Sequence, residues 1–234
     1  MKRFYSVLFV IMLSNLVFAQ DINGFDSNGK RHGKWKKNYE DTNILRYEGQ
    51  FTHGKEVGLF KFYKAYKKKP ILSATKLFNE NDNITEVKFL ASNGKVISEG
   101  KMDGKTYIGT WKYYQKNSDE LLTLETYNNK GELEGERLVY YPNGQIAEKK
   151  NYVYGKLEGE SIWYSLKGIT LKKYVYVNDE LHGLAKFYNP KGELLSEGVY
   201  KRGKKDGIWK YYENSKLTKE KDFSYKPKRT KKTP

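Results

Sequence analysis

The feature that most constrains this chain is a glycine that returns every 24 residues, at Gly135, Gly159, Gly183 and Gly207. Five residues after each of them stands a tyrosine, and seventeen residues after the first three stands another. A fixed period of this length is typical of repeat proteins, in which each unit packs against its neighbours. Four earlier units begin at Gly33, Gly58, Thr85 and Gly109, which brings the total to eight. The unit at Thr85 matches the pattern only weakly.

Each unit has the pattern of a β-hairpin. The segment 110–114 alternates with period two, so Trp111 and Tyr113 should share one face of a strand and Tyr114 should take the other. Tyr141-Pro142-Asn143-Gly144 supplies a turn, because glycine adopts the positive φ that other residues resist. A single hairpin is marginal in water, but stacked hairpins bury their rings against the next unit. The sequence therefore predicts an all-β fold, an elongated antiparallel meander of about eight stacked hairpins.

Glycine-rich connectors of the form Gly-Lys-x-x-Gly join several units, for example from Gly155 to Gly159. The segment from Gly100 to Thr106 superficially resembles a phosphate-binding loop. It has only three residues between its glycines and no helical pattern follows, so we interpret it as another connector. Residues 64–84 are irregular, and 66–70, with three consecutive lysines before a proline, should form a long loop.

These units resemble the MORN repeat in its bacterial variant form, and the resemblance extends from about residue 28 to about residue 223. The clearest units are Gly109-Thr110-Trp111-Lys112-Tyr113-Tyr114 and Gly207-Ile208-Trp209-Lys210-Tyr211-Tyr212, and Pro142-Asn143-Gly144 matches the turn. Three units depart by replacing the tryptophan with Arg137, Ser161 or Ala185. The resemblance implies an extended, twisted sheet that acts as a scaffold or binding surface. Some bacterial members are antitoxin- or immunity-like, eukaryotic relatives are often linked with membranes, and the repeat carries no catalytic residues.

The N-terminus has the layout of a secretory signal, with a basic start at Lys2-Arg3, an apolar run over 7–13 and small side chains before a cleavage point after Ala19. The run is shorter than the ~20 residues that span a bilayer. We therefore expect a signal peptide at 1–19, a repeat array at 20–224 and a basic disordered tail at 225–234. The protein is expected to be exported, either to a periplasm or out of the cell.

Two sets of residues are candidates for partner binding. The formal net charge of +16 favours contact with anionic surfaces, although lysines also keep exposed sheet edges from pairing with other molecules. The most basic segment is the tail, whose candidates are Lys226, Lys228, Arg229, Lys231 and Lys232. The second set comprises rings that lead the units, namely Trp35, Phe60, Trp111 and Trp209. For these rings a structural role, packing one unit against the next, is the favoured interpretation.

Side chains that could support catalysis are few and scattered. The chain has no cysteine, which excludes disulfides and thiolate ligands. The histidines stand beside connector glycines of different units and are expected not to converge on a metal; they are His32, His53 and His182. Acids that recur at similar strand positions are interpreted as cross-strand partners of lysines; they are Glu99, Glu148, Glu197 and Glu220. We therefore expect no enzyme activity, no metal and no cofactor.

The sequence thus favours a non-enzymatic exported scaffold that mediates protein–protein interaction, with an antitoxin- or immunity-like component as a special case. The alternative is a module that binds anionic lipid or polysaccharide of a cell envelope. Nucleic-acid binding is not expected, because no recognised reading motif accompanies the charge. The partner, the binding face and the oligomeric state stay open, since the end strands of a meander could also pair with a second copy.

Overall fold

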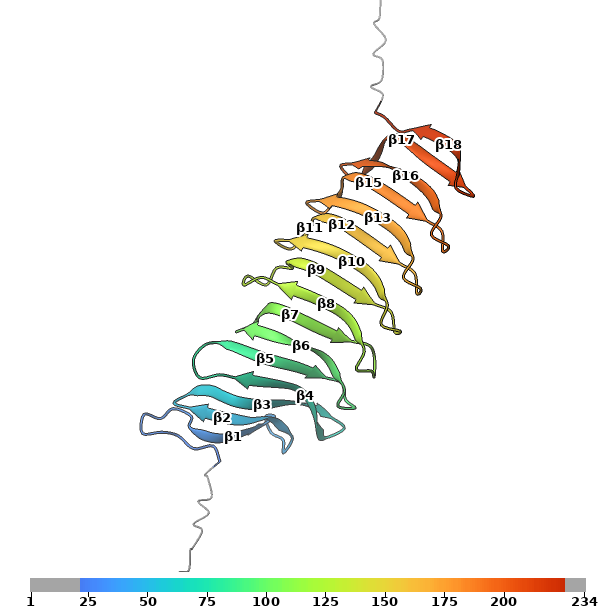
Figure 1. Ribbon diagram of the computed structural model, residues 1–234. Helices are drawn as coiled ribbons and strands as arrows, with labels where there is room; N and C mark the ends of the chain where they lie inside the picture. Colours follow the sequence, from blue (N-terminus) through green and yellow to red (C-terminus); the bar gives the residue numbers. More distant parts are fainter. Residues whose placement is uncertain (1–21, 226–234) are drawn as a thin grey trace, which may run out of the picture.

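The chain folds into one long, twisted, single-layered antiparallel sheet (Figure 1). A computed structural model describes residues 22–225, so the expected signal peptide and the basic tail after Tyr225 lie outside the described residues. All eighteen strands belong to this one sheet, and the two ends of the described chain lie at its opposite ends (Figure 1). The predicted all-β meander is confirmed. Residues 22–225 include no helix long and apolar enough to span a bilayer.

The strands are β1 (Gly33–Asn38), β2 (Leu45–Thr52), β3 (Lys55–Tyr66), β4 (Lys69–Phe78), β5 (Ile84–Leu90), β6 (Val96–Asp103), β7 (Thr106–Tyr114), β8 (Leu121–Tyr127), β9 (Gly135–Tyr140), β10 (Ile146–Val153), β11 (Lys156–Leu157), β12 (Gly159–Tyr164), β13 (Thr170–Val177), β14 (Glu180–Leu181), β15 (Gly183–Tyr188), β16 (Leu194–Lys201), β17 (Lys204–Glu213) and β18 (Lys216–Asp222). The two-residue strands β11 and β14 precede β12 and β15 and pair with the same neighbours. Each of the eight predicted units is therefore one hairpin, from β1–β2 to β17–β18.

Two local expectations are wrong. The segment around Lys67 and Lys68 is no long loop, because β3 and β4 pair as far as Tyr66 opposite Lys69. Both lysines have positive φ, 47° and 60°, as the two central residues of a type I′ turn require. Gly100 belongs to no connector either, since it lies inside β6 and the chain turns only at Gly104, after the strand ends. The presence of lysine or glycine alone therefore does not locate a turn. The alternation of residues in the flanking strands is needed as well.

One face of the sheet, here called the aromatic face, carries the core. Trp111 and Tyr113 lie on this face, with ring centroids 6.3 Å apart, and Tyr114 points to the other side, as predicted. Buried side chains form one cluster around Trp35, Phe51 and Phe60 and a second around Val87, Met102 and Trp111. A third group of rings continues toward the C-terminal end through Trp163, Tyr174, Phe187, Tyr200, Trp209 and Phe223. The rings thus pack successive hairpins against one another within a single layer.

Three glycines inside strands make room for the largest of these rings. A Cβ on Gly100 would lie 2.4 Å from the indole of Trp111, and one on Gly198 would lie 2.3 Å from that of Trp209. Gly49 stands in the same relation to Phe60, at 2.5 Å. Each ring therefore lies flat on the backbone of the preceding strand. In two other units the sizes at the equivalent positions are reversed. Lys150 and Ser161 follow the register pair Lys149–Ile162, and Tyr174 and Ala185 follow the pair Lys173–Lys186.

Candidate binding face

The rings proposed as partner-binding residues lie in the core. The exposed fractions of these residues are 9% for Trp35, 2% for Phe60 and 0% for both Trp111 and Trp209. Tyr107 stacks on Trp111 with the ring centroids 3.9 Å apart, and the Nζ of Lys205 lies 3.8 Å from the Trp209 centroid. The indole N–H of Trp111 also donates to the Lys101 carbonyl at 3.0 Å. Their environment therefore supports the structural role, and the tail candidates Lys226, Lys228, Arg229, Lys231 and Lys232 lie outside the described residues.

The opposite face, here called the ladder face, carries rows of alternating lysine and glutamate. Glu99 lies between Lys88, whose Nζ is 2.9 Å from its carboxylate, and Lys112, which is opposite it in register. Glu197 lies between Lys186, at 3.3 Å, and Lys210 in the same way. The predicted cross-strand pairing of these acids with lysines is confirmed. Glu148 lies on the aromatic face and also has a cross-strand partner, but this is Arg137 on β9 and not a lysine, and Lys150 contacts it from the same strand.

The second tyrosine of the best units binds the same glutamates from the following strand. Tyr114 Oη donates to Glu99 at 2.5 Å, Tyr212 to Glu197 at 2.8 Å and Tyr63 to Glu48 at 2.7 Å. These bonds lower the pKa of Glu48, Glu99 and Glu197, and the lysines nearby act in the same direction. Burial, followed by the bond to Glu99, raises the pKa of Tyr114 to about 12. In the sequence, these contacts are marked by a Glu-Gly pair. The glutamate accepts the hydrogen bond from the second tyrosine of the next strand, and the glycine makes room for the buried ring of that strand. This pair was not identified from the sequence.

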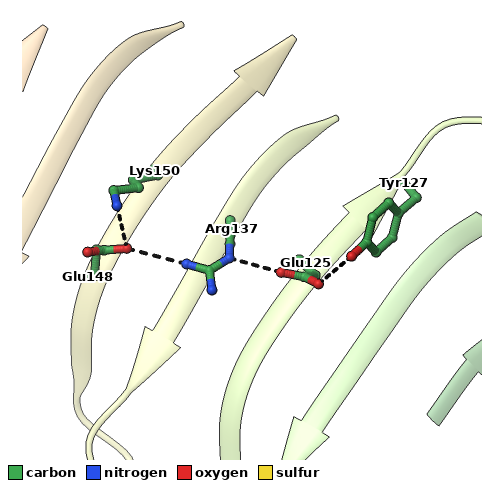
Figure 2. A network of polar contacts seen from close by, with 5 residues as sticks. All are labelled: Glu125, Tyr127, Arg137, Glu148 and Lys150. Carbon is green, nitrogen blue, oxygen red and sulfur yellow. Dashed lines mark hydrogen bonds and ion pairs between the residues drawn. The ribbon is translucent and has the colours of Figure 1, made fainter. Parts of the chain in front are cut away.

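Midway along the array the aromatic face changes character, and charged side chains occupy the ring positions (Figure 2). Arg137 stands where other units have tryptophan, and its Nε lies 2.9 Å from the carboxylate of Glu125 and its Nη1 3.4 Å from that of Glu148. Lys150 closes the row at 3.0 Å from Glu148, and Tyr127 donates to Glu125 at 2.6 Å. Two acids and two bases balance, and both carboxylates contact Arg137. The network therefore joins the second ring cluster to the third without leaving an unpaired charge.

The aliphatic residues behind this network lie on the ladder face. Leu124 and Leu138 are opposite each other in register, and Ile162 is 8% exposed. Across β8–β12 the aromatic face thus becomes charged, while the ladder face gains Leu124, Leu138 and Ile162 and keeps Lys149 between the last two. The sequence shows that Arg137 and Ser161 replace tryptophan, but this change in the two faces depends on the register of three successive hairpins and is not predicted from it.

Exposed aliphatic side chains stand on the ladder face on either side of this region. Leu59 and Leu77 are opposite each other and expose 52% and 47% of their surface. With Thr75, Lys88 and Lys112 they line a hollow of ≈ 430 Å³. Toward the other end, Leu184 lies opposite Val199, at 46% and 43%, and Ile208 on β17 is 57% exposed. The ladder face therefore combines lysine–glutamate rows with apolar side chains that nothing covers among residues 22–225.

The comparison with known families agrees with this architecture. The family model of the MORN repeat variant matches residues 133–154 and 181–202. At these two places the chain carries MORN repeats of the variant type. The two matched segments start 48 residues apart (181 − 133), which is two of the 24-residue periods, and they cover β9–β10 and β15–β16. MORN repeats are commonly protein- or membrane-binding repeats.

Other comparisons add little to the MORN assignment. No curated protein matches the chain significantly. Among solved structures, a mutant of S. aureus TarM in complex with Fondaparinux, alpha-GlcNAc-glycerol and UDP aligns with 63% of this chain and 21% of that chain, with 12% identity and a TM-score of 0.26. The chain thus spans about a fifth of that protein's length, and at this TM-score the similarity supports no conclusion about either fold or function.

Proposed function

We propose that this MORN-repeat protein is a non-catalytic scaffold that binds a protein partner on its ladder face. The observation that carries the proposal is the pair of exposed aliphatic sets, Leu59 with Leu77 and Leu184 with Val199, on the face opposite the buried ring clusters. Apolar side chains rimmed by polar ones are typical of protein-binding surfaces. The non-catalytic assignment is supported by the polar network, because both of its carboxylates contact Arg137.

The charge pattern favours a protein over a polyanion at this face. A polyanion gains most from cations that have no acidic partner, whereas lysines at the centre of the ladder face are already paired with glutamates, as Lys88 is with Glu99 at 2.9 Å. A protein surface can place carboxylates against the lysines and apolar groups against the leucines, which sets register and specificity together. Anionic lipid or polysaccharide is the second candidate, and the observation that favours it is the tail, in which residues 226–234 hold five basic residues and no acid.

Export and an antitoxin- or immunity-like role are the finer parts of the proposal. The segment 1–19 supports export, and in that setting a scaffold would meet its partner in a periplasm or outside the cell. An immunity-like protein would have to cover a toxin surface, and an extended face with two apolar sets suits that task. Identification of a single captured toxin would support this role.

The proposal is tested by affinity capture from the envelope and extracellular fractions of the native cells, using the chain without residues 1–19. We expect one dominant protein, retained at high salt and without residues 225–234. Leu77→Lys and Leu184→Lys should each reduce its recovery about tenfold, because each buries a charge at an apolar contact. Leu166→Lys is the matched control, since Leu166 is 58% exposed but lies in a turn. If recovery of the captured partner requires the tail and low salt, and is unchanged by Leu77→Lys and Leu184→Lys, the protein would instead be a module that binds an anionic surface.

A further inference from the structure

Two of the three histidines come together at the N-terminal end of the sheet. The ring centroids of His32 and His53 are 4.9 Å apart, and His53 Nδ1 lies 2.7 Å from the Oδ2 of Asp26. The expectation that the histidines stay apart is therefore wrong for this pair, because adjacent hairpins bring their turns to the same edge. One ligand atom from each of Asp26, His32 and His53 lies within 4.8 Å of the other two.

The backbone fixes all three residues independently of a ligand. Asp26 Oδ1 accepts the N–H groups of Asn28 and Lys30, each at 2.9 Å, which leaves Oδ2 for the histidine. The N–H of His32 donates to the Gly24 carbonyl at 3.0 Å, and that of Gly54, next to His53, donates to the Arg31 carbonyl at 2.8 Å. The carboxylate and the two imidazoles are thus held on one edge by turns that are themselves tied together.

We propose that Asp26, His32 and His53 bind a divalent transition-metal ion of the Zn²⁺ type. Two imidazoles and one carboxylate are a donor set that Zn²⁺ takes in proteins, with the remaining position left to water. Ligand atoms around a tetrahedral Zn²⁺ are about 3.4 Å apart for bonds of about 2.1 Å. The side chain of His53 is 66% exposed and His32 is exposed, so both rings can turn by the small amount needed.

The contacts already present oppose the ion only weakly. His32 Nδ1 accepts a hydrogen bond from the backbone N–H of His53 at 3.4 Å. This distance is long for a hydrogen bond, so the bond is lost at little cost. The neighbouring Arg31 guanidinium lies 5.0 Å from the Trp35 ring and 3.3 Å from Tyr47 Oη, and so is engaged at the aromatic face. The ion would replace the proton between His53 and Asp26.

The chain contains its own control for this site. His182 precedes Gly183 as His32 precedes Gly33, and Gly203 donates to the Leu181 carbonyl as Gly54 donates to that of Arg31. The place of His53 is taken there by Arg202, which has nearly the same φ, 49° against 48°. The backbone arrangement is therefore repeated near the C-terminal end, but without the second imidazole or the aspartate. An ion at the N-terminal site would join the first turn to the β2–β3 turn and so close the end of the array.

Titration calorimetry of the full chain, without a histidine tag, with Zn²⁺ and Ni²⁺ tests the proposal. We expect one ion per chain, and a loss of affinity of about tenfold or more for His53→Asn and for Asp26→Asn. Asparagine is chosen because it tolerates the positive φ of residue 53 and preserves the turn of residue 26. The matched variant His182→Asn should bind as the parent does, and Zn²⁺ should raise the Tm of the parent and of His182→Asn but not that of His53→Asn.

Three results would overturn the proposal. One is equal affinity in the parent and His53→Asn when circular dichroism shows both to be folded. Another is several weak ions per chain that no substitution removes, which would mean adventitious binding to surface carboxylates. The third is a Tm that does not respond to Zn²⁺ in the parent.

Discussion

Replacing Gly100 by alanine tests the fit between strand glycines and rings, and here the sign of the effect is informative. In an ordinary strand, alanine is more favourable than glycine by about 0.5–1 kcal/mol, because glycine loses more conformational freedom on folding. At Gly100 the new methyl group would lie 2.4 to 2.7 Å from three atoms of the Trp111 indole. Contacts between carbon atoms are favourable at about 3.5–4.0 Å, so the ring must retreat by roughly 1 Å.

The ring has no room to retreat. Trp111 is fully buried, and Tyr107 is stacked on its other side with the ring planes 8° apart. Movement of the indole therefore displaces Tyr107 and lengthens the 3.0 Å bond to the Lys101 carbonyl. Overpacking of this kind costs about 1–3 kcal/mol. After subtraction of the intrinsic gain, we expect Gly100→Ala to lower the free energy of unfolding by about 1–2 kcal/mol.

A double mutant isolates the contact. Trp111→Ala alone should cost about 3–5 kcal/mol, through lost burial and a cavity. In that background Gly100→Ala has no ring to meet and should be neutral or stabilising by up to about 1 kcal/mol. The equivalent positions Tyr174 and Ala185, next to the register pair Lys173–Lys186, already have the large residue on the preceding strand.

Urea unfolding followed by tryptophan fluorescence gives the free energies, and hydrogen exchange of the β6 and β7 amides localises the effect, since a long array need not unfold in one step. The reasoning is refuted if Gly100→Ala is as stable as the parent, or if its cost is the same with and without Trp111.

Three further predictions concern the polar network, the ladder and a turn. Arg137→Leu leaves the carboxylate of Glu125, whose side chain is 9% exposed, without its cation, and should lower the free energy of unfolding by about 1–3 kcal/mol. In urea titrations, recovery of this loss when Glu125→Leu is added would confirm the pairing. A single Arg137→Leu variant as stable as the parent would exclude it. The pKa of Glu99 is lower in the folded than in the unfolded state, so its contribution to the free energy of unfolding is complete above the unfolded pKa and is lost as pH falls through the folded pKa. The contribution of Tyr114 is complete below pH 10 and is lost as pH rises through about 12. Tyr114→Phe should therefore cost about 1–2 kcal/mol at pH 7 and flatten the stability profile at both its acidic and its basic end, and a profile identical to the parent's would count against the bond. Replacing Lys67-Lys68 by Asn-Gly should stabilise the β3–β4 hairpin by about 1 kcal/mol in thermal unfolding, because both positions have positive φ; a lower Tm would argue against the turn type.

The sequence was sufficient to predict features that repeat within one hairpin. The period of Gly135 and its successors fixed the number of units, and the alternation at Trp111, Tyr113 and Tyr114 fixed their faces. These features depend on local periodicity, which a single unit already contains.

Features that depend on contacts between hairpins were missed. The fit of Gly100 to Trp111 and the proximity of His32 to His53 both join residues on different strands or turns, and their alignment depends on β-bulges that shift the register, such as the one between Glu99 and Lys101. The tight turn at 67–68 is not predicted from the sequence, because lysine rarely takes positive φ and the usual Asn-Gly signal is missing there.

The central claim, that the ladder face binds the partner while the rings only build the sheet, is tested most directly by lysine footprinting of the complex with the captured protein. Acetylation of each lysine would be compared in the free chain and in the complex by mass spectrometry. The account predicts protection of ladder-face lysines such as Lys61, Lys88 and Lys186, with unchanged reactivity at the turn lysines Lys67 and Lys167. Protection confined to turn or tail lysines, with the ladder lysines as reactive as in the free chain, would contradict it.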